Sequence, residues 1–354
     1  MRRPLALAAT ALLAALPAAP ALASPEDPQA PSGGVDYPRG GEGPEGSEVA
    51  FEFQDARISE SSGIAPSALH EDVWWTHNDS GDHPSEVYAV DGSGQTLATV
   101  SLGLERRDWE AVAVAEGPDG APSVFVADIG DNFGGSWADY RVYRFPEPEV
   151  LADGVVEPVT LTFTYADGGR DAESMMIDPR DGRVYTVSKE FSGGLYAAPG
   201  TLDPEGANVL ERIDSAPLFA TDAAFGPDGT RYVIRTYWGA TVYDSTDGVP
   251  GRPLGSFDLP ESDQGESVAF TPDGTALMAG TEGLNAPVWR VPLADEYLPE
   301  EPVEVAAEAE PSAEEDGGDG AQDAGNGGAL PFILGGVAVA AVLIGGIVLL
   351  ARRG

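Results

Sequence analysis

The sequence predicts an all-β fold of repeated four-stranded sheets, on the strength of its composition and of one recurring pattern. Its 354 residues include 45 glycines and 30 prolines, which favours short strands and tight turns over long helices. A strand that starts with polar, mostly acidic residues and continues with apolar ones recurs five times, at spacings of roughly 45 to 63 residues. Four of the five copies then reach a Pro/Asp/Gly turn of the kind that joins antiparallel strands. A four-stranded sheet repeated at this period is typical of a β-propeller blade.

The recurring pattern marks the first strand of each predicted blade. The five copies are Glu60–Ala65, Asp108–Ala113, Asp171–Met176, Ala220–Phe225 and Gln264–Ala269. Runs rich in β-branched and aromatic residues follow each copy and predict its second and third strands. Four of the copies also have a fourth such run, and the last copy has none. The segment Val49–Phe53, which precedes the first copy, is the candidate for the missing strand, because pairing the two ends would close the ring and remove its open edges.

We therefore predict a β-propeller of five blades over residues 48–294. Six blades remain an alternative, because the second repeat is long enough to contain an extra element. A β-sandwich is a further alternative, but it would not account for the recurring strand and turn.

The two ends of the chain resemble membrane-targeting signals. Residues 1–23 combine Arg2 and Arg3 with an apolar run and an Ala-Leu-Ala exit, which predicts a secretory signal peptide. Residues 329–351 are uncharged and apolar, and as a helix they would span about 34 Å, enough for a transmembrane segment. Basic residues in the tail 352–354 predict a cytoplasmic C-terminus. We thus expect a single-pass membrane protein that contacts lipid through its C-terminal helix and holds the propeller outside the cell.

Two segments of biased composition flank the predicted propeller. Residues 24–47 are rich in Pro and Gly, and we expect them to be disordered. Residues 295–328 contain twelve acidic residues and no basic one, which predicts an acidic disordered tether.

Charge and composition exclude several classes of function. A formal net charge of −40 repels phosphate backbones, so we expect no nucleic-acid partner. The absence of cysteine excludes disulfides, zinc–thiolate sites and cysteine nucleophiles.

The repeats predict where a site would lie. In a propeller, the start of the first strand and the end of the second strand of each blade meet on one face. The starts supply many carboxylates, of which Glu110, Glu173 and Glu266 are the candidate metal ligands in the central channel. Hard oxygen ligands suit Ca²⁺, so calcium is the first cofactor to test. The alternative is that these acids cap strands and bind backbone amides.

The same face collects further polar residues as candidate rim ligands. They are Asn78, Asp79, Asp128, Asp131, Lys189, Arg235 and Glu282. Lys189 and Arg235 could hold a phosphate or carboxylate beside a bound cation, or they could neutralise neighbouring acids. No motif of a hydrolase elbow, zinc protease or phosphate loop is present, so no catalytic residue is assigned.

The motifs Trp75–Asp82, Asp108–Glu110, Asp128–Asn132 and Gly265–Gly274 resemble those of secreted bacterial, mostly actinobacterial, β-propeller proteins of uncharacterised function. The resemblance covers residues 59–292. The blade starts are also distantly similar to those of phytase-like and SdiA-regulated propellers. This similarity implies a calcium-binding propeller and, for phytases, a phosphomonoesterase. Phytase propellers present several cations to phosphate, whereas this rim offers little beyond Lys189 and Arg235.

Three functions follow as hypotheses. The first is a membrane-anchored module that binds an extracellular ligand or protein through its acidic rim, without catalysis. The second is a calcium-dependent, phytase-like phosphoesterase. The third is a purely structural surface module.

Overall fold

A computed structural model describes residues 40–299. The predicted signal peptide, the transmembrane segment, the C-terminal tail and most of both flanking segments lie outside the described residues. Within residues 40–299, no helix is long and apolar enough to cross a membrane.

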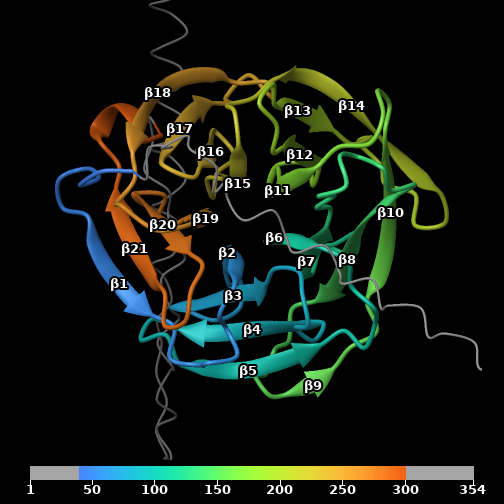
Figure 1. Ribbon diagram of the computed structural model, residues 1–354, viewed down its shortest axis with the longest axis horizontal. Helices are drawn as coiled ribbons and strands as arrows, with labels where there is room; N and C mark the ends of the chain where they lie inside the picture. The colour runs from blue at the N-terminus through green and yellow to red at the C-terminus, as the bar shows by residue number, and fades with distance from the viewer. Residues whose placement is uncertain (1–39, 300–354) are drawn as a thin grey trace, which may run out of the picture. The chain divides into compact units, whose positions relative to one another are not determined.

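The described chain folds into five four-stranded antiparallel units, the blades of a β-propeller, which are arranged in a ring around the axis of the predicted channel (Figure 1). Blade 1 contains β2 (Ser61–Pro66), β3 (Val73–Asn78), β4 (Glu86–Asp91) and β5 (Thr96–Ser101). Blade 2 contains β6 (Trp109–Glu116), β7 (Pro122–Asp128), β8 (Tyr140–Pro146) and β10 (Val159–Tyr165). Blade 3 contains β11 (Ala172–Ile177), β12 (Val184–Ser188), β13 (Gly194–Ala197) and β14 (Ala207–Ser215). Blade 4 contains β15 (Ala220–Phe225), β16 (Arg231–Thr236), β17 (Gly239–Asp244) and β18 (Arg252–Asp258).

Blade 5 joins the two ends of the propeller. Its strands are β19 (Gly265–Phe270), β20 (Ala276–Thr281), β21 (Pro287–Pro292) and, as the outermost strand, β1 (Glu48–Glu52). Antiparallel pairing of β1 with β21 matches Glu48 with Arg290 and Glu52 with Pro287. The N-terminal strand therefore supplies the missing fourth strand, as the sequence predicted.

The inner strands form a closed ring of five. Strand β2 contacts β6 and β19, β11 contacts β6 and β15, and β15 contacts β19. The long second repeat contains one extra element, the two-residue strand β9 (Gly154–Val155), which pairs in parallel with β5 of blade 1. Parallel pairing of β10 with β14 also links the outer edges of blades 2 and 3. The extra length thus ties blades together and does not make a sixth blade.

Apolar side chains form five clusters, one between each pair of neighbouring blades. Trp75 of blade 1 and Trp109 of blade 2 lie in one cluster, and Met176 of blade 3 and Ile234 of blade 4 lie in another. Within residues 40–299 the five clusters fill every interface between neighbouring blades, so this part of the chain has a core of its own.

The predicted turns reverse the chain after the inner strands of blades 2 to 5. Each turn ends on a glycine with positive φ: Gly120 (79°), Gly182 (71°), Gly229 (72°) and Gly274 (69°). Residues other than glycine rarely adopt this backbone conformation. In blade 1, Asp72 takes the corresponding place with a φ of 54°. This explains why that repeat lacks the Pro/Asp/Gly signature.

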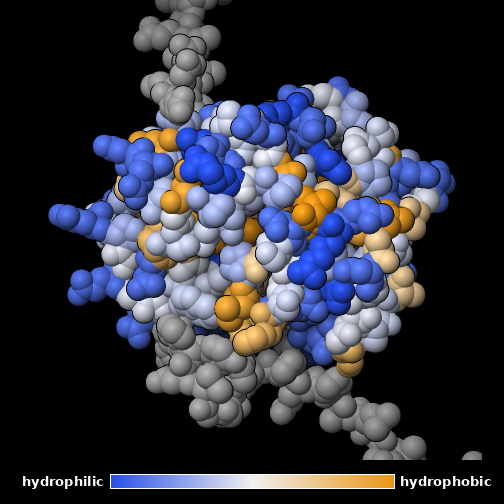
Figure 2. All heavy atoms as spheres, turned by 90° about the horizontal axis from the view of Figure 1, so that it is seen from above, coloured by the Kyte–Doolittle hydropathy of each residue, from blue (hydrophilic) through white to orange (hydrophobic). Residues whose placement is uncertain are grey.

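The described structure extends a few residues beyond the predicted bounds of 48–294. The Gly41 amide donates to the Leu259 carbonyl (2.9 Å), and Gly41 forms a parallel bridge with Pro260. At the other end, residues Asp295–Tyr297 form a 3₁₀ turn, and the Tyr297 ring packs on Phe257 with centroids 5.5 Å apart. Figure 2 shows a largely hydrophilic surface with small separate hydrophobic patches.

Candidate functional site

Each inner strand carries a β-bulge near its start, and the bulges lie at equivalent places in the five blades. The pairing between first and second strands shifts at these points. The residues passed over are Ser62, Glu110, Glu173, Thr221 and, in blade 5, Glu266 with Ser267. A bulge leaves its extra residue out of the ladder and re-aims its side chain. The three glutamates predicted as channel ligands therefore occupy equivalent ring positions, and serine and threonine occupy the other two.

The ends of the second strands meet the starts of the first strands, as predicted. Backbone amides of Asp79, Ile129, Lys189 and Glu282 donate to carbonyls of Glu60, Asp108, Asp171 and Gln264 at 2.8 to 3.1 Å. We call the resulting group at the mouth of the channel the acidic rim. It comprises Asp79, Asp108, Glu110, Glu173, Lys189, Glu266 and Glu282, whose charges act on one another.

Lys189 neutralises one side of the acidic rim. Its ammonium group forms an ion pair with the Glu173 carboxylate, and its Nζ lies 5.4 Å from the centroid of the Tyr237 ring. The negative charges of Glu173 and Glu266 raise the pKa of Lys189 well above its ordinary value, against the opposing effect of burial, which is the largest influence. Lys189 therefore stays charged at neutral pH.

Three carboxylates converge on the other side of the acidic rim. One oxygen each of Asp79, Asp108 and Glu110 lies within 4.8 Å of the other two. Asp79 follows β3 of blade 1, whereas Asp108 immediately precedes β6 of blade 2 and Glu110 lies at the bulge near the start of that strand. We call these three residues the carboxylate cluster. Asp108 and Glu110 are buried, so this concentration of negative charge is held away from bulk water.

The backbone around the carboxylate cluster is shaped to leave room for it. A Cβ atom on Gly130 would lie 2.1 Å from Glu110 Oε1 and 2.6 Å from Asp108 Oδ2, so any larger residue there would displace these two carboxylates. The Arg106 guanidinium donates to the carbonyls of Asn78 (2.8 Å), Ser80 (2.9 Å) and His83 (3.0 Å), which fixes the loop that carries Asp79.

Burial and mutual repulsion raise the pKa of the rim carboxyls. For Glu110 the main cause is burial, followed by the charges of Asp79 and Glu173, and its pKa lies well above its ordinary value. For Glu282 burial comes first and the charge of Glu266 second, and together they raise its pKa to about 9. These groups gain by holding a proton or by facing a cation.

Three predicted rim ligands instead hold the structure of the loops. The Asn78 side chain accepts hydrogen bonds from the amides of Ser59 and Glu60 (both 3.0 Å). Asp128 accepts from the Asp108 amide (2.9 Å) and the Tyr143 hydroxyl (2.9 Å).

Asp131 likewise folds its own loop, because it accepts from the Trp137 amide (2.8 Å) and the Tyr140 hydroxyl (3.0 Å). Arg235 is buried, and its Nη1 donates to the carbonyls of Ser267 (2.5 Å) and Gly280 (2.7 Å). Both cations considered for a phosphate, Lys189 and Arg235, thus have partners within the protein.

The sequence places Asp108, Gly130 and Tyr237 at the rim, but it does not single out Asp108 as a metal ligand or give Gly130 and Tyr237 a role. Asp108 and Glu110 are two residues apart, a spacing that would have suggested a shared strand face. The bulge at Glu110 and the close approach of the Gly130 loop leave no such signal, because they depend on pairing between distant segments.

The comparisons with known proteins assign neither a family nor a function to this chain. No family model matches the chain, and no curated protein matches it. Among solved structures, a gluconolactonase from Xanthomonas campestris is similar over 70% of this chain and 89% of its own, with 15% sequence identity and a TM-score of 0.42. The assignment of the propeller rests on the strand pairing described above.

Proposed function

We propose that this protein is a cation-dependent binding module whose propeller holds a divalent metal ion, calcium by its ligand chemistry, at the carboxylate cluster. The observation that carries the proposal is the convergence of oxygens from Asp79, Asp108 and Glu110 within 4.8 Å of one another. Buried carboxylates repel each other unless they are protonated or neutralised by a cation.

The ligand chemistry favours calcium among the common cations. The cluster offers oxygen alone, and Ca²⁺ accepts six to eight oxygen ligands in flexible geometry, including carboxylates, carbonyls and water. Softer metals prefer sulfur and imidazole, which the three residues do not provide. The space kept open at Gly130 supports this fit, since the two buried carboxylates could not occupy their places beside any larger residue.

Lys189 explains why the proposed site lies off the centre of the ring. The metal ligands predicted from the sequence, Glu110, Glu173 and Glu266, would share one cation on the axis of the ring. Since Glu173 is paired with Lys189, the lysine supplies the positive charge on that side of the acidic rim. We therefore propose Asp79, Asp108 and Glu110 as the metal ligands. The side of the acidic rim that carries Lys189 would then contact the extracellular ligand or protein that the propeller binds.

A calcium titration of thermal unfolding tests this proposal. The protein from Ser24 to Pro299 contains all five described blades. Calcium at 100 times its dissociation constant should stabilise the fold by about 2.7 kcal/mol. The variants Asp108→Asn and Glu110→Gln should abolish this stabilisation, because each removes a charged ligand.

Two variants serve as controls. Glu173→Gln removes a rim acid outside the cluster and should keep the response to calcium. Gly130→Ala should lose the response, since its Cβ displaces both carboxylates, whereas Gly200→Ala, which meets nothing within 4 Å, should keep it. A melting temperature that ignores calcium in the wild-type protein would refute the metal site and leave a purely structural module.

The binding role is favoured over phosphoester hydrolysis by the cations of the rim. The side chains of Lys189 and Arg235 already bind Glu173 and backbone carbonyls. We therefore expect no release of phosphate from phytate or from p-nitrophenyl phosphate, with or without calcium. Calcium-dependent release that disappears in Lys189→Ala would overturn the binding role in favour of the phosphoesterase.

We further propose that the propeller is displayed outside the cell membrane and meets an extracellular ligand or protein. The support comes from the sequence alone. Residues 1–23 resemble a signal peptide, residues 329–351 resemble a transmembrane segment, and the acidic segment 295–328 joins the propeller to the latter. Protease shaving of intact cells should release the propeller, and a propeller that is protected until the cells are lysed would contradict this location.

A further inference from the structure

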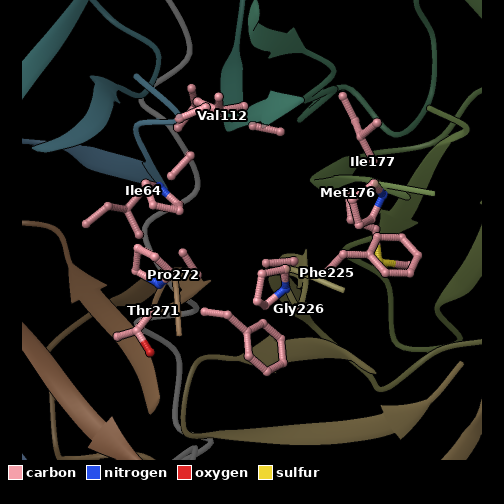
Figure 3. A pocket seen from close by; sticks show the side chains of 18 of the residues that line it. Ile64, Val112, Met176, Ile177, Phe225, Gly226, Thr271 and Pro272 are labelled. Carbon is pink, nitrogen blue, oxygen red and sulfur yellow. The ribbon is translucent and has the colours of Figure 1, made fainter. Parts of the chain in front are cut away.

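A cavity lies at the opposite end of the inner strands from the acidic rim. It is lined by the later residues of all five inner strands and by the loops that follow them, and its volume is about 310 Å³. Figure 3 shows its labelled residues around the opening, each blade contributing part of the wall. They are Ile64, Val112, Met176, Ile177, Phe225, Gly226, Thr271 and Pro272.

Most of the described side chains that line this cavity are apolar, and none of them is charged. None of the described residues that line it has an ionisable side chain, although the whole chain has a net charge of −40. The hydroxyls among the lining residues already have partners. Ser67 Oγ donates to the Glu147 carboxylate (2.5 Å), and Thr271 Oγ1 donates to the Asp273 carboxylate (2.5 Å).

The wall is also rigid enough to keep its shape. Ile64, Val112 and Met176 are at most 5% exposed and belong to three different inter-blade clusters. Collapse of the cavity would require strands that are paired into separate blades to move together. An apolar cavity of about 150 Å³ binds benzene, so one of twice that volume has room for a larger molecule.

We propose that this cavity is a binding site for an uncharged, mainly apolar small molecule of the size of a medium-chain alcohol. The apolar side chains of the wall favour transfer of a hydrocarbon body from water. A charged head group has no counter-ion among the described lining residues, and burying it would cost far more than the hydrocarbon gains. The channel thus has two chemically distinct mouths, one for a cation and one for a neutral apolar ligand.

The methionines provide a direct test. Of the four in the chain, Met175 and Met176 line the cavity, whereas Met278 lies in the cluster between blades 5 and 1. In the protein from Ser24 to Pro299 labelled at the methionine methyls, 1-octanol should shift the signals of Met175 and Met176 saturably and leave Met278 in place. Octanoate, with the same carbon chain and a negative charge, should bind at least about tenfold more weakly.

A pair of matched variants assigns the binding to the cavity. Ala224→Leu adds bulk at a lining position, and we expect it to weaken octanol binding at least about tenfold by occupying the space. Ala115→Leu makes the same change at a partly buried position that does not line the cavity and should leave binding unchanged. If Ala224→Leu does not fold, Ala113→Leu takes its place. The proposal is wrong if octanol causes no saturable shift, if octanoate binds equally well, or if the filled variants bind as the wild type does.

Discussion

Lys189 is the only lysine in the chain, and its side chain lies among the carboxylates of the acidic rim. Glu173, its ion-pair partner, is 3% exposed, and Lys189 itself is 22% exposed. Removing one partner of such a pair leaves an uncompensated charge in a site with little water. The stability of the rim therefore depends strongly on this one cation.

We predict that Lys189→Met destabilises the protein by about 3–5 kcal/mol in urea unfolding at neutral pH. The reason is that Glu173 and Glu266 lose their positive neighbour. Lys189→Arg, which keeps the charge, should cost much less, and adding Glu173→Gln to Lys189→Met should recover part of the loss. A Lys189→Met variant as stable as the wild type would show that the ion pair contributes nothing.

Glu282 should make stability depend on pH. Its pKa rises from 4.5 in the unfolded chain to about 9 in the folded protein, so the folded state binds this proton more tightly. Its contribution to stability is therefore greatest below pH 4.5 and decreases as the pH rises towards 9. We predict that, without calcium, Glu282→Gln flattens the fall in melting temperature between about pH 5 and pH 9.

The matched control for this effect is the exposed residue Glu116, at the end of β6. The melting temperature of Glu116→Gln should change with pH in the same way as that of the wild type. If the melting temperature of Glu282→Gln falls as steeply as that of the wild type over the same pH range, another carboxyl governs the pH dependence of stability.

At the scale of the strands, the sequence predicted the blades well because each strand is encoded locally. The predicted inner strands match β2, β6, β11, β15 and β19 to within a few residues, and the segment Val49–Phe53 overlaps β1. Short runs of alternating or apolar residues between turns contain this information. The prediction of five blades is confirmed by the ring of inner strands.

The details of the rim could not be predicted in the same way. The bulges at Glu110 and Glu173 arise from pairing with β7 and β12, and the pairing of Lys189 with Glu173 depends on the side-chain geometry that results. Sequence spacing alone could not separate Asp131, which folds its own loop, from Asp79, which joins the carboxylate cluster. Both follow a second strand and look alike in the repeat.

Strand β1 allows a test of how much the closing pair stabilises the ring. Phe51 is 5% exposed and packs edge-on against Phe53, with centroids 5.6 Å apart, whereas Val49 on the same strand is 42% exposed. We predict that Phe51→Ala costs about 3–5 kcal/mol in urea unfolding, and that Val49→Ala changes stability by no more than about 0.5 kcal/mol. Equal effects of the two substitutions would mean that β1 contributes little to the core.

At the scale of the whole molecule, the charge of −40 makes self-repulsion a general cost of folding. We predict that NaCl raises the melting temperature between about 20 mM and 200 mM, because the Debye length falls over this range. Calcium should add a further increase at the higher salt concentration, since the carboxylate cluster is largely buried. Magnesium at the same ionic strength should add less, because it demands a stricter octahedral geometry.

A calcium effect that vanishes at the higher salt concentration would indicate screening of surface charge instead of a site. Asp108→Asn separates the two cases, because it should remove the calcium increment and keep the response to NaCl.

The pairing of β1 with β21 also dictates an order of events during biosynthesis. The segment Glu48–Glu52 emerges from the ribosome early, yet the neighbour with which it pairs, Pro287–Pro292, is made about 235 residues later. Until that moment the nascent chain holds an unmatched edge open to other chains. The circle can therefore close only after all five blades have been synthesised, which leaves a long interval in which a chaperone would shield the open edge.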